Sequence, residues 1–177
     1  MSAKKSFGQS KPQNNPLLEK SNLQYQAPRF DLIKDEHFEP AFEYAIKIHD
    51  AELDKIINSK EAPTFENTVL ALEKSGEDLN RATSIFYNLT GSNTNDKLQK
   101  IEEKYAPIFS AHNDKLFLNS KIYQRIKSLS LTQFSGEKAK LISFYLEQFE
   151  MAGANLPEDK KQIMKNINQD LATLSTT

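Results

Sequence analysis

The chain has 177 residues, of which 23 are basic and 24 acidic, so its formal net charge is -1. This balance gives no support to a nucleic-acid or anionic-membrane partner, which a basic surface would attract. No window approaches the run of about 20 apolar residues that a membrane-spanning helix needs. The absence of cysteine excludes disulfides, thiolate metal sites and a cysteine nucleophile, and it suits a reducing compartment. We expect a cytoplasmic location, with a periplasmic one left open, and neither a nucleic-acid nor a membrane partner.

Residues 1–16 are mostly polar and lack the apolar stretch of a secretory signal. Their composition predicts a disordered lead-in. Residues 17–33 are expected to be extended, because Pro16 and Pro28 disfavour helix around themselves. The apolar side chains of this segment that can pack on a neighbour are Leu17, Leu18, Tyr25, Phe30, Leu32 and Ile33.

The first long helix is expected after Asp35, whose side chain suits an N-cap, and Pro40 fits its first turn. Residues at helical spacing then form one stripe. Its members are Phe38, Phe42, Ala45, Ile46, His49, Leu53, Ile56 and Ile57. Residues 58–63 break this pattern.

A second helical stretch is expected to begin with Thr64 as its cap and to bend near Gly76. Its apolar face consists of Phe65, Val69, Leu72, Leu79, Ala82, Ile85, Phe86 and Leu89. Residues 90–95 are predicted to form a turn that ends in cap residues.

Asp96 lies in the first turn of the next predicted helix, where a negative charge suits the helix dipole. We expect Pro107 to kink this helix, because proline lacks an amide hydrogen and crowds the preceding turn. The inner side is predicted to consist of Leu98, Ile101, Tyr105, Ile108, Phe109, His112, Leu116 and Leu118.

Three more helices are expected, at residues 120–129, at residues 136–152 and from Pro157 onward, with Gly153 ending the second of them. Inward positions in the first two are Ile122, Ile126, Leu129, Leu141, Phe144, Tyr145 and Phe149, and the last helix carries Ile163, Ile167, Leu171 and Leu174. The chain is therefore predicted to be all-α, a bundle of about six helices with an extended N-terminal lead-in. Its domain spans residues 17–177 and is truncated within its last helix, which has no stop signal.

The candidate metal ligands are His37, His49 and His112, and none has a second histidine four residues later, as one face of a zinc helix would require. We expect these histidines to be partly buried or to lie in the core. The acidic pairs at residues 35–36, 102–103 and 158–159 fit solvated helix faces or first helical turns. We predict no catalytic residue and no metal ligand in this chain.

Several sequence blocks occur in a fixed order. The most specific is APTFENTVLALEKSG at residues 62–76. The others are NPLLE (15–19), APRFDLI (27–33), HFEPAF (37–42), FYNLT (86–90), NTNDKLQ (93–99), AGANL (152–156) and LATLST (171–176). Together they resemble the N-terminal helical region of the thimet oligopeptidase/oligopeptidase A family of zinc metallopeptidases, with the bacterial peptidyl-dipeptidases as the nearest branch. Compared with that family, the connection at residues 128–135 is short.

The resemblance implies one part of a larger, two-lobed helical peptidase, in which this region forms part of the wall of a peptide-binding cleft. The full-length enzyme would release C-terminal dipeptides, using zinc held by a His-Glu-x-x-His helix that this sequence lacks. We therefore expect no cofactor and no activity in this chain, and zinc only in the full-length enzyme. The implied partners are the C-terminal catalytic domain and short peptides. The polar turn of Ser92, Asn93, Thr94 and Asn95 is a candidate to face the peptide, although helix capping explains the same residues.

The alternative is a stand-alone helical module that binds a peptide or protein without catalysis. Leu171 and Leu174 distinguish the two hypotheses. In a stand-alone protein they are expected to pack within the chain. In a fragment they are expected on an exposed apolar patch, with self-association as a consequence.

Overall fold

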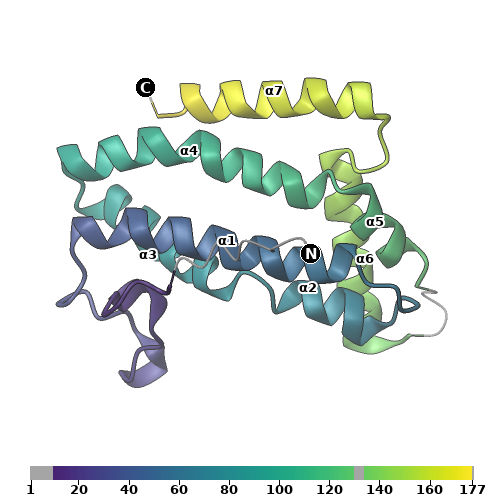
Figure 1. Ribbon diagram of the computed structural model, residues 1–177, viewed down its shortest axis with the longest axis horizontal. Coiled ribbons are helices and arrows are strands. Elements are labelled where there is room, and N and C mark those ends of the chain that lie inside the picture. Colours follow the sequence, from purple (N-terminus) through teal and green to yellow (C-terminus); the bar gives the residue numbers. More distant parts are fainter. Residues whose placement is uncertain (1–9, 130–133, 177) are drawn as a thin grey trace, which may run out of the picture.

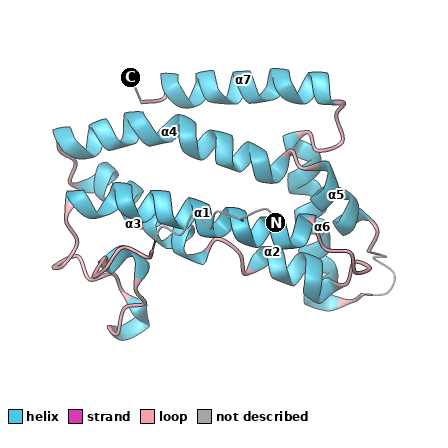
Figure 2. Cartoon of the chain, in the orientation of Figure 1, coloured by secondary structure: helices cyan, strands magenta, loops and turns pink. Residues whose placement is uncertain are grey.

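The computed structural model describes residues 10–129 and 134–176, and every regular element in these two ranges is a helix (Figure 2). The predicted all-α fold is confirmed. No helix in the same ranges is both long enough and apolar enough to cross a membrane. Most of the predicted lead-in and half of the connection at residues 128–135 lie outside the described residues, so those predictions stay untested.

The helices are stacked in layers (Figure 1). Helix α1 lies in the middle with α3 against one side of it and α4 against another, α7 lies along the outer side of α4, and α5 and α6 close one end of the stack. The bounds are α1 Phe38–Ile57, α2 Ala71–Glu73, α3 Glu77–Ser92, α4 Asp96–Phe117, α5 Ser120–Lys127, α6 Gly136–Ala152 and α7 Glu158–Leu174. Short helical turns occur at η1 Pro16–Leu18, η2 Gln24–Gln26, η3 Asp35–His37 and η4 Phe65–Leu70.

One half of the core joins the start of α1 to α3 and α4. The ring of Phe42 packs edge-on against Phe86 and Phe109, at centroid distances of 5.3 and 4.9 Å, and it lies 5.0 Å from the ring of Tyr105. Leu17 from the N-terminal segment is fully buried in the same cluster. Such aromatic pairs stabilise a core beyond the area that they bury.

The other half of the core joins the end of α1 to η4, α5 and α6. Its fully buried members include Leu53, Ile122, Ile142 and Phe149. Helix α7 belongs to neither cluster, and its one fully buried residue is a lysine, Lys161. The last helix is therefore attached mainly by polar contacts.

In the middle of the chain, local sequence signals set where the helices begin and end. Thr64 caps η4, because its hydroxyl accepts from the amide of Asn67 while the Asn67 side chain accepts from the amide of Thr64. This reciprocal pair is a capping box with asparagine in the usual place of Glu or Gln. Gly76 then has φ +70, a conformation that favours glycine, and it separates α2 from α3. The predicted cap at Thr64 and bend near Gly76 are confirmed.

Several local predictions were wrong. Asp35 does not cap α1: it lies inside η3, where the ring of His37 accepts from the amide of Lys34 instead. The extended segment contains η1 and η2, and Tyr25, expected to pack on a neighbour, is 93% exposed. The turn expected at residues 90–95 is shorter, because α3 continues through Ser92.

Two side chains expected inside are exposed. Phe144 is exposed because Ile142, about 200° away around α6, is the residue that faces the core. Ile108 lies at the edge of the inner face of α4. Helix α4 is continuous through Pro107.

Candidate functional site

The turn predicted to face a peptide lies between α3 and α4, and all four of its residues are exposed. Ser92 donates its hydroxyl to the carbonyl of Asn88 at 2.6 Å. Asn95 caps α4 by accepting from the amides of Lys97 and Leu98. Ser92 and Asn95 are therefore occupied by bonds at the helix ends, and the exposed middle residues of the turn are Asn93 and Thr94.

A pocket of about 410 Å³ borders this turn. Its lining combines Asn88, Asn93, Asn95 and Asp35 with apolar residues such as Phe30. The side-chain amide of Asn95 donates to Asp35 at 3.2 Å, so the amides that remain for a ligand are those of Asn88 and Asn93. Amide groups both donate and accept hydrogen bonds, so they match the alternating polar groups of an extended peptide backbone. The pocket therefore has the chemistry for a short peptide segment with one apolar side chain.

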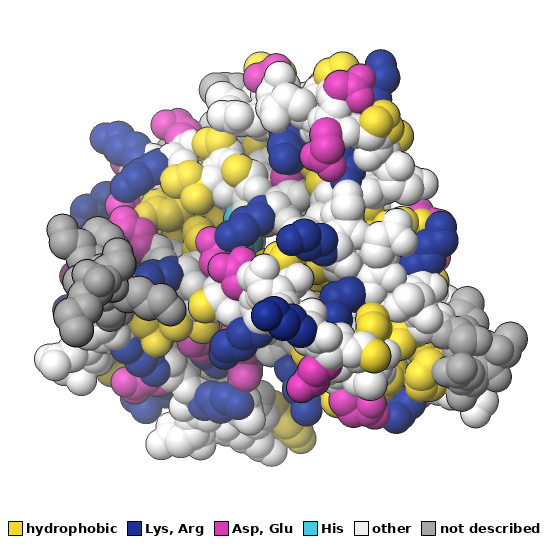
Figure 3. Space-filling model, turned by 45° about the vertical axis from the view of Figure 1, so that its right-hand side comes forward, with side chains coloured by type: hydrophobic (Ala, Val, Ile, Leu, Met, Phe, Trp, Pro, Cys, Tyr) yellow, Lys and Arg dark blue, Asp and Glu magenta, His cyan; other side chains and the backbone are white. Residues whose placement is uncertain are grey.

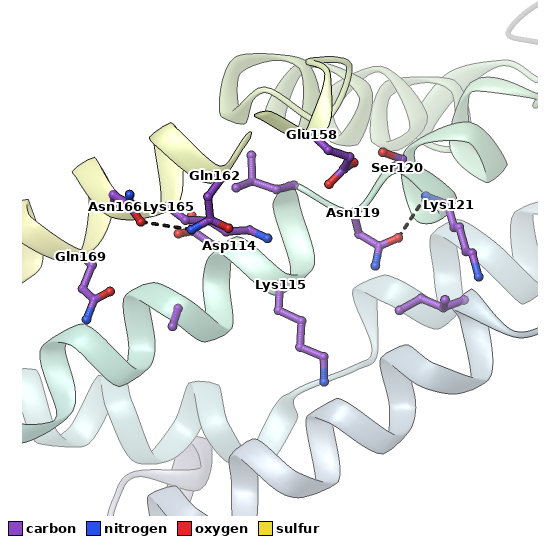
Figure 4. Close-up of a pocket in the computed structure, with 13 residues that line it drawn as sticks. Asp114, Lys115, Asn119, Ser120, Lys121, Glu158, Gln162, Lys165, Asn166 and Gln169 are labelled. Atoms are coloured by element: carbon purple, nitrogen blue, oxygen red, sulfur yellow. Dashed lines mark hydrogen bonds between the residues drawn. The ribbon is translucent and has the colours of Figure 1, made fainter. Parts of the chain in front are cut away.

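A second groove of about 650 Å³ runs beneath α7 (Figure 4). Its lining comes from the end of α4, the start of α5 and the near side of α7. Polar members are Asp114, Lys115, Asn119, Ser120, Lys121, Glu158, Gln162, Lys165, Asn166 and Gln169. The acids are partly engaged: Asp114 accepts from the amide of Asn168 at 2.7 Å, and Glu158 pairs with Lys161 at 3.1 Å. Lys115 pairs with Asp50 at 2.8 Å, so the groups left to meet an anionic or peptide-like ligand are Lys121, Lys165 and the side-chain amides.

The histidines form a cluster that sequence reasoning missed. His49 and His112 come from α1 and α4, and a nitrogen of each ring lies 2.9 Å from the other. The second nitrogen of His49 is 3.2 Å from the hydroxyl of Ser75, and that of His112 is 3.3 Å from Asp50. A pattern search could not find this pair, because the two positions lie 63 residues apart.

Burial controls the protonation of this cluster. Burial and the neighbouring His112 lower the pKa of His49 to about 4. Burial likewise lowers the pKa of His112, against an opposing effect of Asp50. Both rings are therefore neutral at pH 7, and the bond between them requires one ring to donate and the other to accept.

The two rings do not fit a zinc site. Their facing nitrogens are joined directly by a hydrogen bond, and no group of three or more His, Cys, Asp or Glu side chains in the described ranges is placed to hold a metal ion. His37 lies apart, where its ring accepts from the amide of Lys34.

Comparison with known proteins identifies relatives for most of the chain. The dipeptidyl carboxypeptidases of Salmonella typhimurium and Escherichia coli are 40% and 35% identical to it, over 90% and 92% of its length. The oligopeptidase A of Haemophilus influenzae is 27% identical over 92% of the chain. The chain is therefore homologous to a part of each of these dipeptidyl carboxypeptidases. No family model matches it.

The homology covers only part of each relative. The chain spans about a quarter of the length of the dipeptidyl carboxypeptidases and of the oligopeptidase A, at 24% in each case. The family resemblance seen in the sequence blocks is confirmed. The peptide-facing role of the turn at residues 92–95 is not tested by these relationships and stays a prediction.

Proposed function

We propose that this chain is the N-terminal helical part of a peptidyl-dipeptidase-like zinc metallopeptidase and forms part of the wall of its peptide-binding cleft. The observation that carries this proposal is the 40% identity to a dipeptidyl carboxypeptidase over nine-tenths of the chain. The longer protein would hydrolyse oligopeptides and release C-terminal dipeptides in the cytoplasm, with its zinc held by residues outside residues 1–177. The chain itself contributes no catalytic group to that reaction.

Exposed apolar surface supports a larger parent protein. Leu171 and Leu174, the residues that distinguish a fragment from a stand-alone protein, are 60% and 70% exposed. Apolar side chains also project from the N-terminal segment, where Tyr25, Phe30 and Leu32 are exposed. Contiguous exposed apolar patches mark interaction sites on proteins. The partner that we propose for the N-terminal segment is the remaining three-quarters of a protein as long as the relatives.

The turn between α3 and α4 is the proposed peptide contact of this wall. Asn93 and Thr94 are exposed, and Asn93 lines the adjoining pocket together with Phe30. An extended peptide could exchange backbone hydrogen bonds with Asn93 while a side chain enters the pocket. Ser92 and Asn95 then have a supporting role, because both are occupied in holding the helix ends.

The decisive experiment compares the 177-residue chain with the longest protein encoded in frame with it. Both are purified with and without added zinc and assayed for dipeptide release from a blocked tetrapeptide. We expect about one bound zinc per molecule and turnover in the longer protein, and neither in the chain. Zinc-dependent hydrolysis by the chain alone would overturn the proposal.

The peptide contact has its own test in the longer protein. The double substitution Asn93→Ala/Thr94→Ala is expected to raise KM severalfold with little change in kcat, because it removes contacts made before the chemical step. Asn155→Ala, at an exposed asparagine that lines neither pocket, is the matched control. An unchanged KM would reject the turn as a peptide contact.

The alternative, a binding module without catalysis, is favoured by the lysine- and amide-lined groove beneath α7. It predicts that the chain alone binds short acidic peptides. Lys121→Glu and Lys165→Glu are expected to weaken that binding. Absence of binding at millimolar peptide would reject this alternative.

A further inference from the structure

Four polar side chains from separate parts of the chain form a line of contacts, which we call the serine relay. Its members in spatial order are Asp50, His112, His49 and Ser75. Nδ1 of His112 lies 3.3 Å from Asp50, and its Nε2 lies 2.9 Å from Nδ1 of His49. Nε2 of His49 lies 3.2 Å from the hydroxyl oxygen of Ser75. A nucleophile within hydrogen-bond reach of a base, with the base oriented by a further group, is the arrangement that nucleophilic catalysis requires.

Asp50 sets the direction of the hydrogen bonds along the serine relay. A carboxylate only accepts hydrogen bonds, so the ring hydrogen of neutral His112 lies on Nδ1, which faces Asp50. Nε2 of His112 then accepts from Nδ1 of His49, and Nε2 of His49 is left without a hydrogen. Lys115 pairs with the same carboxylate oxygen at 2.8 Å. The hydroxyl of Ser75 therefore faces an imidazole nitrogen that can take its proton.

The turn that carries Ser75 is held against α1. The amide of Gly76 donates to Glu52 at 2.8 Å, and the absence of a Cβ at Gly76 leaves room for the ring of His49. The hydroxyl of Ser75 donates to the carbonyl of Leu72 at 2.7 Å. Because a hydroxyl has one hydrogen and rotates freely, that hydrogen can turn from Leu72 to His49 while the oxygen stays in place.

The serine relay borders a pocket of about 720 Å³ that is lined from α3, α4, α6 and α7. His49, His112 and Ser75 belong to this lining, and its aromatic side chains are Tyr87, Phe109, Phe117 and Tyr145. Apart from the neutral histidines, the titratable acids and bases that line it among the described residues are Glu73 and the tyrosines, and Glu73 accepts from the hydroxyl of Tyr145 at 2.6 Å. Without a lining Lys or Arg from the described ranges, the pocket suits an uncharged ligand with an aromatic group better than an anion.

The imidazole rings themselves are largely covered. His49 is 9% exposed. Only a small area of histidine is visible on the face drawn in Figure 3, between basic and acidic side chains. A ligand that enters the pocket therefore meets the hydroxyl of Ser75 beside a base that is mostly shielded from solvent.

We propose that Ser75 is a nucleophilic serine activated by His49, and that the pocket takes a small, uncharged ester with an aromatic acyl group. Oγ of Ser75 bonds to the carbonyl carbon of the ester while the hydroxyl proton passes to Nε2 of His49. The bond from that carbon to the leaving alkoxide then breaks, and the alkoxide takes the proton and departs as an alcohol. Water hydrolyses the acyl-serine by the same route and restores Ser75.

Other residues of the site support this reaction. The side-chain amides of Asn80 and Asn113 line the pocket, and such amides donate to a carbonyl oxygen as it gains negative charge. His112 and Asp50 are positioning residues, because they act by fixing the tautomer of His49. The reaction needs no zinc and does not rest on the parent peptidase. The prediction of no catalytic residue from the sequence did not consider these contacts, since they join α1 and α4 to the turn before α3.

The base is weak, which limits the rate. Burial and the neighbouring His112 lower the pKa of His49 to about 4. The ring is therefore in its base form at neutral pH, but it draws a proton from a hydroxyl only weakly. We expect slow acylation by activated reagents rather than rapid turnover, and esters rather than peptide bonds as substrates.

The first experiment locates the nucleophile. The 177-residue chain is treated with phenylmethanesulfonyl fluoride in the presence of EDTA, and the product is mapped by mass spectrometry. One sulfonyl group per molecule is expected on Ser75, where the Oγ–S bond forms, the S–F bond breaks and fluoride leaves. Ser143 is the internal control, because it is more exposed and also donates to a helix carbonyl but bonds to no histidine.

Variants then test the base. Ser75→Ala is expected to abolish the modification, and Ser143→Ala is expected to leave it unchanged. His49→Gln is expected to slow it by about tenfold or more, since it removes the general base. With p-nitrophenyl phenylacetate, the unaltered chain is expected to release a burst of about one p-nitrophenol per molecule that Ser75→Ala lacks. Circular dichroism confirms that each variant keeps its helices.

NMR of the imidazole nitrogens tests the serine relay in the unaltered chain. We expect the ring hydrogen on Nδ1 in both His49 and His112 at pH 7. Asp50→Asn places an amide donor next to Nδ1 of His112, so it is expected to move both hydrogens to Nε2 and to slow the modification of Ser75. A purely structural role of Asp50 would leave the tautomers unchanged.

Three results would overturn the proposal. One is modification of Ser75 that is absent or no faster than that of Ser143. The second is an unchanged rate in His49→Gln. The third is a hydrogen on Nε2 of His49 in the unaltered chain, because the serine relay would then donate to Ser75 instead of accepting its proton.

Discussion

His49 on α1 and His112 on α4 are joined by a hydrogen bond of 2.9 Å across 63 residues of sequence. The bond lies where the two halves of the core meet, and Ser75 and Asp50 extend it at either end. Lys115 pairs with the same Asp50 at 2.8 Å, so both a cation and an anion lie next to the cluster. The state of this pair therefore affects the packing of the two longest inner helices.

We predict that acid destabilises the protein through this pair. The folded-state pKa of His49 is lowered from 6.5 to about 4, so the folded protein binds fewer protons than the unfolded chain between these two values. The stability contributed by the neutral ring is present above pH 6.5 and is lost as the pH falls toward 4. The loss amounts to about 3 kcal/mol at most. A pair with both rings charged would also lose its hydrogen bond.

The measurement is urea unfolding at pH 7 and pH 4.5 for the unaltered chain and for the double variant His49→Phe/His112→Leu. For each protein, the loss is the decrease in the free energy of unfolding between pH 7 and pH 4.5. Carboxylates titrate over this range in both proteins, so the difference between the two losses reports the contribution of the histidines. We expect the free energy of unfolding to decrease less in the double variant than in the unaltered chain. His37→Gln is the control and is expected to keep the full loss, and equal losses in all three proteins would contradict the prediction.

The histidine pair also shows how far the sequence could predict this fold. Helical spacing correctly placed His49 and His112 on inward faces, because spacing reports which side of a helix is covered. It could not report that the two faces meet at these positions, since that depends on how α1 and α4 are stacked. The same limit applies to α7. Helical spacing shows the apolar residues Ile163, Ile167, Leu171 and Leu174, but the side that faces the rest of the chain is polar, with Asn168 bonded to Asp114 of α4 and Lys161 bonded to Ser120 of α5.

Gly76 is predicted to be intolerant of substitution for two separate reasons. Its φ of +70 disfavours any other residue, and an added Cβ would lie 2.9 Å from the ring of His49. Gly76→Ala is therefore expected to lower the free energy of unfolding by more than about 1 kcal/mol. Gly91→Ala is the matched control, because a Cβ there meets no atom within 4 Å. Inside a helix that change is expected to be neutral or to stabilise by up to about 1 kcal/mol. Equal effects on thermal unfolding would refute this argument.

Thr64 is predicted to stabilise the start of η4 through its capping box with Asn67. Thr64→Ala removes the acceptor for the Asn67 amide and is expected to cost about 0.5–2 kcal/mol. Thr64→Ser keeps the hydroxyl and is expected to cost much less. Thr94→Ala changes an exposed threonine outside the helices and is expected to have no measurable effect on unfolding by urea.

Asn168 is predicted to hold α7 against α4. Its amide donates to Asp114, whose pKa is raised by burial. Asn168→Ala leaves that buried carboxylate without its amide donor, at a cost of about 1–3 kcal/mol. The cost is expected to appear locally, because α7 contributes no residue to either apolar cluster of the core. Amide hydrogen exchange is expected to accelerate throughout α7, while exchange in α1 and α3 stays unchanged. Asn166→Ala, two residues earlier in α7, removes only a solvent-exposed bond with Gln162. It is expected to leave exchange in α7 as it was, and acceleration by both variants alike would show that the Asp114 contact does not attach the helix.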